Sequence, residues 1–218
     1  MSVDVLKLTL GPLQTNCYML GDDASGAALV IDPADHADLL VKTAREHGWT
    51  IRAILATHGH FDHVLASGPL QQETGAPFYA HHADLPLIQA LVSQVRARMG
   101  ISASPPAEVT HFVQADETIT VGGIVLEVLY TPGHSPGHVS YVLRERQTVF
   151  SGDCLFRGSI GRTDLPGGNY PTLMRSITKQ LLPLGDAFTV APGHMENTTI
   201  GYERAHNPYL LDYFGRIS

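Results

Sequence analysis

The pattern of apolar and polar residues predicts short strands in neighbouring runs, with helices between the runs. Residues 3–10 alternate between apolar and polar side chains, as a half-buried strand does. Residues 16–20 and 27–31 are apolar runs on either side of a turn at 21–26. Further strands are expected at 50–57, 77–80, 117–121, 124–130, 139–143, 148–151 and 188–191.

Helical periodicity and end signals predict four helices and a partly helical tail. Gly48, Gly75 and Gly100 follow the first three, at positions where glycine commonly ends a helix. Residues 100–112 are expected to form a loop between two halves, and residues 156–169 show no periodicity. The predicted helices are 35–47, 63–73, 84–99 and 171–182, with a tail at 199–214.

The order of these elements indicates a fold class. Strands in neighbouring runs, rather than strict alternation with helices, favour two mixed sheets packed face to face with helices outside. Without a long Gly/Ser linker, we expect residues 1–218 to form a single domain.

Composition excludes several classes of protein. With 218 residues, 44% of them hydrophobic, the chain can bury a full core. It has no apolar run long enough to span a membrane, and its start lacks signal-peptide features, so we expect a cytosolic protein. The net charge of −7 and the absence of a basic block speak against nucleic-acid binding. Two cysteines are too few for a disulfide framework, whereas twelve histidines suggest metal.

The stretch THGHFDH, directly after a predicted buried strand, concentrates metal-ligand chemistry. His58 and His60 are two residues apart, so at a strand end both side chains project to the same side and can share one ion. Asp62 and His63 lie past the turn and can serve a second ion. A carboxylate without cysteine suits an open, catalytic site rather than a closed structural one.

Three more motifs follow predicted strands and offer the missing ligands. His134 in TPGHSPGH is expected to bind metal, whereas His138 is expected to be a structural hydrogen-bonding residue. Asp153 in SGDC can bridge two cations, and its neighbour Cys154 is expected to be a small buried residue. His194 in APGH has the same strand, loop and ligand order.

Together, THGHFDH, TPGHSPGH, SGDCLF and APGH resemble the metallo-β-lactamase superfamily, over residues about 10–209. SIGRTDLPGG at 159–168 and GYERAHNPY at 201–209 are most similar to its glyoxalase II (hydroxyacylglutathione hydrolase) group, in the compact bacterial form. The resemblance implies a four-layer αββα sandwich of two mixed sheets. It also implies that His58, His60 and His134 hold one metal, that Asp62, His63 and His194 hold the other, and that Asp153 bridges them.

The resemblance further implies hydrolysis of a small-molecule thioester, such as a glutathione conjugate. A hydroxide bridging two divalent ions attacks the carbonyl, and Asp62 helps to orient it. Zinc is the expected metal, with iron or manganese as alternatives. Larger members bind glutathione through basic residues of a C-terminal extension, which this sequence does not show.

Contacts with the substrate are less clearly indicated than the metal ligands. Arg162 matches a basic substrate-contacting position and is the expected substrate-binding residue, although it could instead pair with Asp164. Tyr202, Arg204 and Tyr209 are interpreted as packing residues of the tail. The sequence specifies neither the acyl group nor the oligomeric state.

Four other functions are open at this point. An iron-dependent persulfide dioxygenase would use His58, His134 and Asp153 for one iron. A lactonase or β-lactamase would use the same hydroxide on a ring ester or amide. A metal-stabilised binding module would need a closed coordination shell, and a nuclease is disfavoured by the negative charge.

Overall fold

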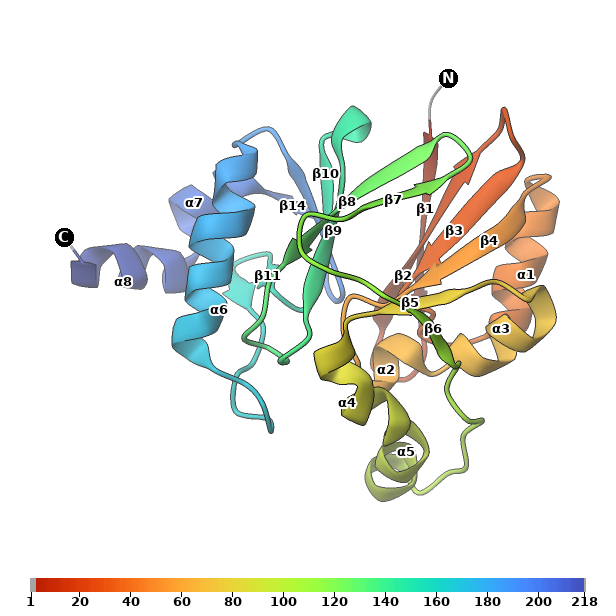
Figure 1. Ribbon diagram of the computed structural model, residues 1–218. Helices are drawn as coiled ribbons and strands as arrows, with labels where there is room; N and C mark the ends of the chain where they lie inside the picture. Colours follow the sequence, from red (N-terminus) through yellow and green to blue (C-terminus); the bar gives the residue numbers. More distant parts are fainter. Residues whose placement is uncertain (1–2, 218) are drawn as a thin grey trace.

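The computed structural model describes residues 3–217 and contains two six-stranded sheets that stand face to face (Figure 1). The strand order in the first sheet follows the sequence, β1-β2-β3-β4-β5-β6. Its first three strands are antiparallel, whereas β3 to β6 are parallel. The strands are β1 (Val3–Leu10), β2 (Thr15–Asp22), β3 (Ala27–Ile31), β4 (Thr50–Leu55), β5 (Phe78–Ala80) and β6 (Val109–Phe112).

The second sheet has the order β14-β13-β10-β9-β8-β7, in which only β10 and β13 are parallel neighbours. A two-stranded hairpin, β11 (Leu155–Phe156) with β12 (Ser159–Ile160), follows β10. The strands of the sheet are β7 (Thr118–Val121), β8 (Ile124–Tyr130), β9 (Val139–Leu143), β10 (Thr148–Gly152), β13 (Thr189–Pro192) and β14 (Thr198–Thr199).

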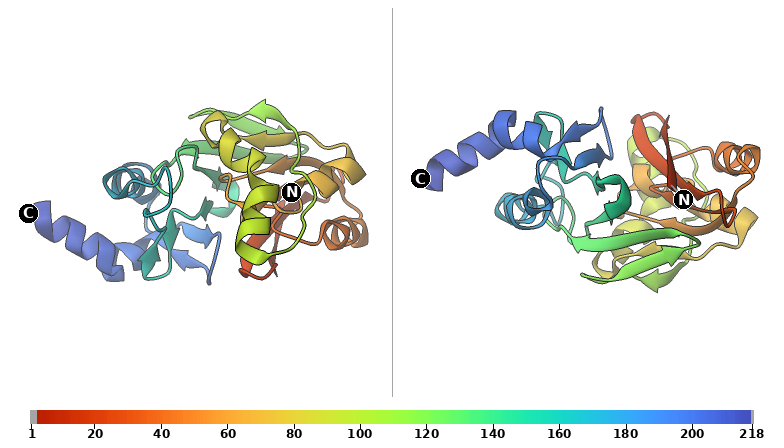
Figure 2. Two further views of the ribbon diagram at one scale, coloured as in Figure 1. Left: turned by 90° about the horizontal axis from the view of Figure 1, so that it is seen from below. Right: turned by 90° about the horizontal axis from the view of Figure 1, so that it is seen from above.

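Helices cover the outer faces of both sheets. In Figure 1, α1 and α3 lie outside the first sheet, and α6 and α7 lie outside the second. The helix α8 extends away from the sheets in both views of Figure 2. The α-helices are α1 (Ala37–Glu46), α2 (Phe61–Val64), α3 (Ser67–Thr74), α4 (Leu85–Gln89), α5 (Leu91–Met99), α6 (Tyr170–Ser176), α7 (Ile200–His206) and α8 (Pro208–Ile217). Shorter helical turns span His82–Asp84, Arg144–Arg146, Ile177–Leu181 and Leu182–Leu184.

Three apolar clusters fill the spaces between the four layers. The alternation of side chains along β4 shows how, because Leu55 packs between the two sheets whereas Ile54 packs toward the helices of the first half. A third cluster, which includes Leu173 and Val190, lies between the second sheet and its helices. The structure therefore confirms the predicted αββα sandwich of two mixed sheets. Within residues 3–217, no helix combines the length and apolar character needed to cross a membrane.

Two predicted helices are interrupted. The helix expected at 63–73 is instead two helices, α2 and α3, because the backbone N–H of Ala66 donates to the carbonyl of Pro33 at 2.9 Å. The helix expected at 84–99 is divided at Ala90, where ψ falls to 0° between α4 and α5. The glycines predicted to end these segments, Gly75 and Gly100, do so with left-handed backbone angles.

Two short strand segments lie where loops were expected. The end of the expected 100–112 loop is β6, which pairs in parallel with β5. Its side chains are half-buried or exposed, so it carries no apolar alternation that would reveal a strand. The hairpin of β11 and β12, at the start of the aperiodic 156–169 segment, has strands of two residues, which are too short to show a period.

Candidate metal centre

Four strand ends bring the predicted ligand residues together. The stretch from His58 to His63 follows β4 of the first sheet, whereas His134, Asp153 and His194 follow β8, β10 and β13 of the second. The structure assembles all seven predicted ligands into three overlapping groups, whose potential ligand atoms lie within 4.8 Å of one another. The groups are His58, His60 and His134; His58, His63 and Asp153; and Asp62, His63 and His194.

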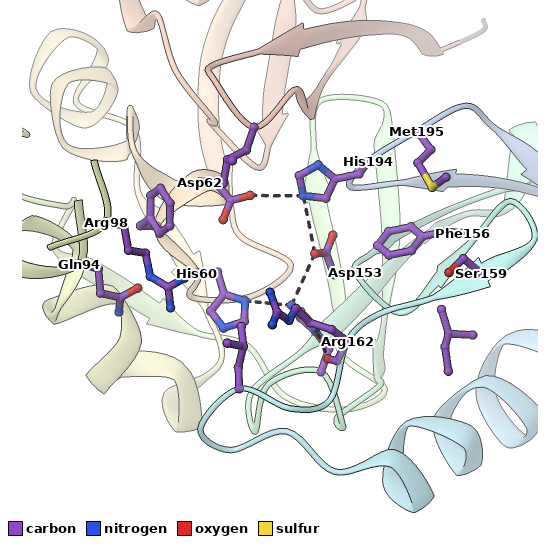
Figure 3. A pocket seen from close by; sticks show the side chains of 15 residues that line it. His60, Asp62, Gln94, Arg98, Asp153, Phe156, Ser159, Arg162, His194 and Met195 are labelled. Atoms are coloured by element: carbon purple, nitrogen blue, oxygen red, sulfur yellow. Dashed lines mark hydrogen bonds and ion pairs between the residues drawn. The ribbon is translucent and has the colours of Figure 1, made fainter. Parts of the chain in front are cut away.

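The carboxylate of Asp153 lies between the two sets of histidines. Its Oδ1 is 3.4 Å from Nε2 of His63, and its Oδ2 is 3.5 Å from Nε2 of His134 and 3.7 Å from Nε2 of His194. Figure 3 shows Asp153 between His194 and the His60 side of the cluster. One carboxylate thus faces members of both sets, as a bridging ligand must.

Three buried polar atoms of this cluster lack a hydrogen-bond partner among residues 3–217: Nε2 of His58, Nε2 of His63 and Oδ1 of Asp153. Buried polar atoms in folded proteins are nearly always paired, because leaving one unpaired costs the desolvation free energy. All three belong to one of the groups that could hold a metal. The donor set therefore fits divalent cations.

Hydrogen bonds on the far side of two imidazole rings fix which nitrogen faces the cluster. Nδ1 of His63 is 2.9 Å from a carboxylate oxygen of Asp32, and Nδ1 of His134 is 2.8 Å from the carbonyl oxygen of Arg162. Because these oxygens can only accept, Nδ1–H donates in both rings and Nε2 faces the cluster, where that of His134 lies 2.8 Å from Nδ1 of His60. Burial lowers the pKa of His63, but Asp153, Asp62 and Asp32 outweigh it and raise the pKa well above its ordinary value, so a cation bound at Nε2 would displace a proton.

Burial keeps two of the histidines neutral. It lowers the pKa of His58 well below its ordinary value, and the neighbouring His63 and His60 lower it further. Burial, followed by the nearby His134, lowers the pKa of His60 to about 4. Neutral imidazoles have a free lone pair at neutral pH, which metal binding requires.

For the two carboxyl groups of the cluster, neighbouring histidines outweigh burial and keep the charged form. Burial alone would raise the pKa of Asp62, but His63 and a hydrogen bond with His194 outweigh it and lower the pKa to about 2. Burial also opposes ionisation of Asp153, yet His63 and His134 hold its pKa well below the usual range. Both carboxyl groups are therefore ionised at neutral pH and offer negative oxygens to a cation.

A carboxylate that the sequence did not single out, Asp84, holds two ligand loops together. Oδ2 accepts hydrogen bonds from the N–H of Gly59 at 2.8 Å and the hydroxyl of Ser135 at 2.6 Å, and Oδ1 accepts from the N–H of Gly137 at 2.6 Å. Gly59 lies between His58 and His60, where a Cβ atom would meet the carbonyl oxygen of Asp84 at 2.8 Å. The close approach requires glycine at this position.

Asp32, at the end of β3, was also missed as a supporting residue. Its carboxylate accepts hydrogen bonds from the N–H and the hydroxyl of Thr57, each at 2.7 Å, as well as from His63. The only signal in the sequence was its place directly after a buried strand, which it shares with the ligand motifs.

The structure bears out the expected roles of two residues beside the ligands. Nε2 of His138 accepts a hydrogen bond from the N–H of Asp153 at 3.0 Å, and its Nδ1 lies 2.9 Å from the hydroxyl of Thr131. His138 thus positions the Asp153 backbone. Cys154 is completely buried, and burial raises the pKa of its thiol far above the ordinary value.

A cavity of about 450 Å³ opens beside the cluster (Figure 3). Arg162 lines it as expected, and its guanidinium also makes two 2.7 Å hydrogen bonds to Asp164. Two further polar residues of the wall, Gln94 and Arg98, were missed because polar residues on a helix surface are usual and carry no motif. The other lining residues are Leu13, His60, Phe61, Asp62, His134, Asp153, Phe156, Ser159, Ile160, Leu165, His194 and Met195.

Comparison with known proteins agrees with this arrangement of strands and ligands. The sequence profile of the Metallo-beta-lactamase superfamily matches residues 10–194. The chain belongs to this superfamily. Members of the metallo-β-lactamase superfamily are metal-dependent hydrolases or related enzymes, which agrees with the His/Asp cluster at the strand ends.

Three relatives illustrate the similarity. The hydroxyacylglutathione hydrolase GloC of Haemophilus influenzae is 38% identical over 214 residues, which cover 96% of this chain and 98% of the relative. The crystal structure of the B3 metallo-beta-lactamase BLEG-1 has a TM-score of 0.88 at 37% identity and covers 95% of this chain and 99% of that one. The structure of TTHA1623 in a di-iron-bound form has a TM-score of 0.85 at 41% identity, covering 94% and 100%.

Proposed function

We propose that this protein is a dinuclear metallohydrolase that cleaves thioesters, with a glyoxalase II-like preference for 2-hydroxyacyl conjugates of glutathione. The observation that carries the proposal is the position of Asp153 between two sets of candidate ligands. Three buried polar atoms of this cluster, which have no hydrogen-bond partner among residues 3–217, support it, because bound cations would pair them. The similarity to GloC over nearly the whole chain supports the choice of substrate.

The ligands are assigned as the sequence motifs suggest. His58, His60 and His134 would hold one cation, and Asp62, His63 and His194 would hold the other. Asp153, whose oxygens face His63, His134 and His194, would contact both. Zinc, iron and manganese all suit nitrogen and oxygen donors, and zinc is our proposal for the cell. Such a pair of cations supplies a hydroxide at neutral pH and polarises a carbonyl oxygen.

The protein's own groups orient the reaction. Asp62, with a pKa of about 2, remains a carboxylate, so it can accept a hydrogen bond from the attacking water and offer Oδ2, which faces His194, to a cation. The hydroxyl of Thr15, which donates to the same oxygen at 3.0 Å, fixes its direction. Attack forms a carbon–oxygen bond and breaks the carbon–sulfur bond, which releases a carboxylic acid and a thiol.

The cavity offers the substrate an apolar wall and a polar wall. Phe156, Ile160 and Leu165 supply apolar surface, and Arg162 remains our candidate for a substrate contact at the rim. Asp164 already accepts two hydrogen bonds from Arg162. We therefore expect Arg162 to contribute little to substrate binding.

The test is thiol release from S-lactoylglutathione, measured with a thiol reagent on protein of known metal content. We expect turnover with about two metals per chain and its loss in Asp153→Ala. Absence of turnover by fully metallated protein would overturn the proposal. As a folding control, Asp153→Ala should keep the far-UV circular dichroism spectrum of the parent.

A second candidate is β-lactamase activity, favoured by the 37% identity to BLEG-1 over most of both chains. Hydrolysis of a chromogenic cephalosporin faster than of the thioester would favour it. Oxygen uptake with glutathione persulfide by protein containing one iron per chain would instead favour the dioxygenase.

A further inference from the structure

The cavity beside the metal centre has arginines on two of its walls, Arg98 from α5 and Arg162 from the loop after β12. Figure 3 shows Arg98 and Gln94 on the same side of the cavity as His60, across from Phe156 and Met195. The two arginines differ in how their charge is balanced, and this difference indicates which one is available to a ligand.

The guanidinium of Arg162 is already occupied. Its Nε donates to Oδ1 of Asp164 and its Nη2 to Oδ2, both at 2.7 Å. This is the two-point geometry in which arginine binds a carboxylate most strongly. Asp164 uses two of the five N–H groups, and a substrate carboxylate at the remaining three would lie beside the negative charge of Asp164.

The guanidinium of Arg98, in contrast, forms no ion pair with any carboxylate of residues 3–217. It lies instead over the ring of Phe61, whose centroid is 5.9 Å from Cζ. Phe61 is buried and stands between the ligands His60 and Asp62, so this contact places the positive charge beside the metal centre.

Gln94 extends the same polar wall. It lies four residues before Arg98, which puts the two side chains on one face of α5. Its amide nitrogen donates to the carbonyl of Leu87 at 3.3 Å, which holds the side chain in place at the cavity. Gln94 and Arg98 thus form one polar strip of the cavity wall.

We propose that Arg98, supported by Gln94, binds a carboxylate on the thiol half of the substrate. This inference rests on the proposed thioester hydrolysis. The thioester carbonyl must lie against the His/Asp cluster, so the thiol half extends into the rest of the cavity, where α5 forms one wall. A guanidinium with free N–H groups selects a carboxylate there.

The test compares two thioesters with the same lactoyl group. S-lactoylglutathione carries carboxylates on its thiol half, and S-lactoyl-N-acetylcysteamine carries none. For Arg98→Ala we expect kcat/KM with the first substrate to fall about 10-fold through KM, since one charged hydrogen bond is lost. Turnover of the second substrate should not change. Arg96→Ala is the matched control, because Arg96 lies on the same helix outside the cavity.

Equal losses with both thioesters, or no loss with S-lactoylglutathione, would overturn the role of Arg98. The same holds if Arg96→Ala reproduces the effect. If the parent protein hydrolyses neither thioester, the proposed function fails, and calorimetry with glutathione then tests the site alone. Binding about 10-fold weaker in Arg98→Ala than in Arg96→Ala supports it, and equal affinities contradict it.

Discussion

The carboxylate of Asp84 accepts three hydrogen bonds from the loops that carry the candidate metal ligands. Both its oxygens are used, by Gly137 on one side and by Gly59 and Ser135 on the other. An asparagine has the same shape but only one accepting oxygen. Its amide N–H groups would face a backbone N–H, so at least one buried donor would be unpaired.

We therefore expect Asp84→Asn to lower the free energy of unfolding by about 1–3 kcal/mol, the typical cost of an unpaired buried polar group. The metal content should fall as well, because Gly59 and Ser135 adjoin ligands in both loops. Urea unfolding and elemental analysis measure the two effects. Asp38→Asn, at an exposed carboxylate of α1, is the control. A variant as stable and as metal-rich as this control would contradict the assigned role.

At the scale of residues, the sequence predicted which candidate ligands come together, but it did not predict the residues that support them. Metal chemistry restricts a ligand to a few residue types, so closely spaced histidines such as His58 and His60 are informative. Asp32 and Asp84 act through hydrogen bonds to backbone N–H groups, which any sequence offers. Arg98 lies on an exposed helical face, and only the fold reveals that this face lines the cavity.

Between elements, a turn of the first sheet is hydrogen-bonded to a turn of the second. The carboxylate of Asp22, at the end of β2, accepts hydrogen bonds from the hydroxyl of Ser25 and, at 2.8 Å, from the N–H of Gly123 in the turn between β7 and β8. These hydrogen bonds lower the pKa of Asp22, with that from Ser25 the largest cause. The ionised carboxylate is therefore the form that stabilises this junction.

The lowered pKa gives this junction a predictable pH dependence. A carboxyl group with a lower pKa in the folded state stabilises above its unfolded pKa, and the effect is lost as pH falls through the folded value. Asp22→Asn should therefore destabilise the protein at pH 6 and have a smaller effect near pH 3. Denaturant unfolding across this range measures the difference, with Asp4→Asn in β1 as the control. A difference that grows as pH falls would contradict the assignment.

At the scale of elements, apolar runs bounded by turn residues predicted the main strands. Ala27–Ile31 and Ile124–Tyr130 have the predicted bounds because their apolar runs end at turns. The break at Ala66 depends on a hydrogen bond to Pro33, a residue distant in sequence, and β6 depends on pairing with β5. Such long-range contacts leave no local pattern.

Over the whole molecule, the proposed cations connect ligands from both sheets. We expect a chelator to lower the melting temperature, because a bound metal stabilises by about 4 kcal/mol when present at a thousandfold excess over its Kd. Calorimetry before and after chelation, followed by zinc addition, measures the loss and its recovery. Asp153→Ala should show a smaller shift. If removal of all metal leaves the melting temperature unchanged, the cations do not join the two halves.

The order of the proposed ligands along the chain also determines which of the two metal sites can be completed first during translation. Of the proposed ligands, His58, His60 and His134 have all been made before β9 begins, whereas His194 follows β13, much later. Because a chain emerges from the ribosome N-terminal end first, the first set can bind its ion while the last strands are still being made. The second set cannot be completed until the second sheet has received β13. Filling of the second site therefore reports that translation has passed residue 194 and that both halves have closed on each other.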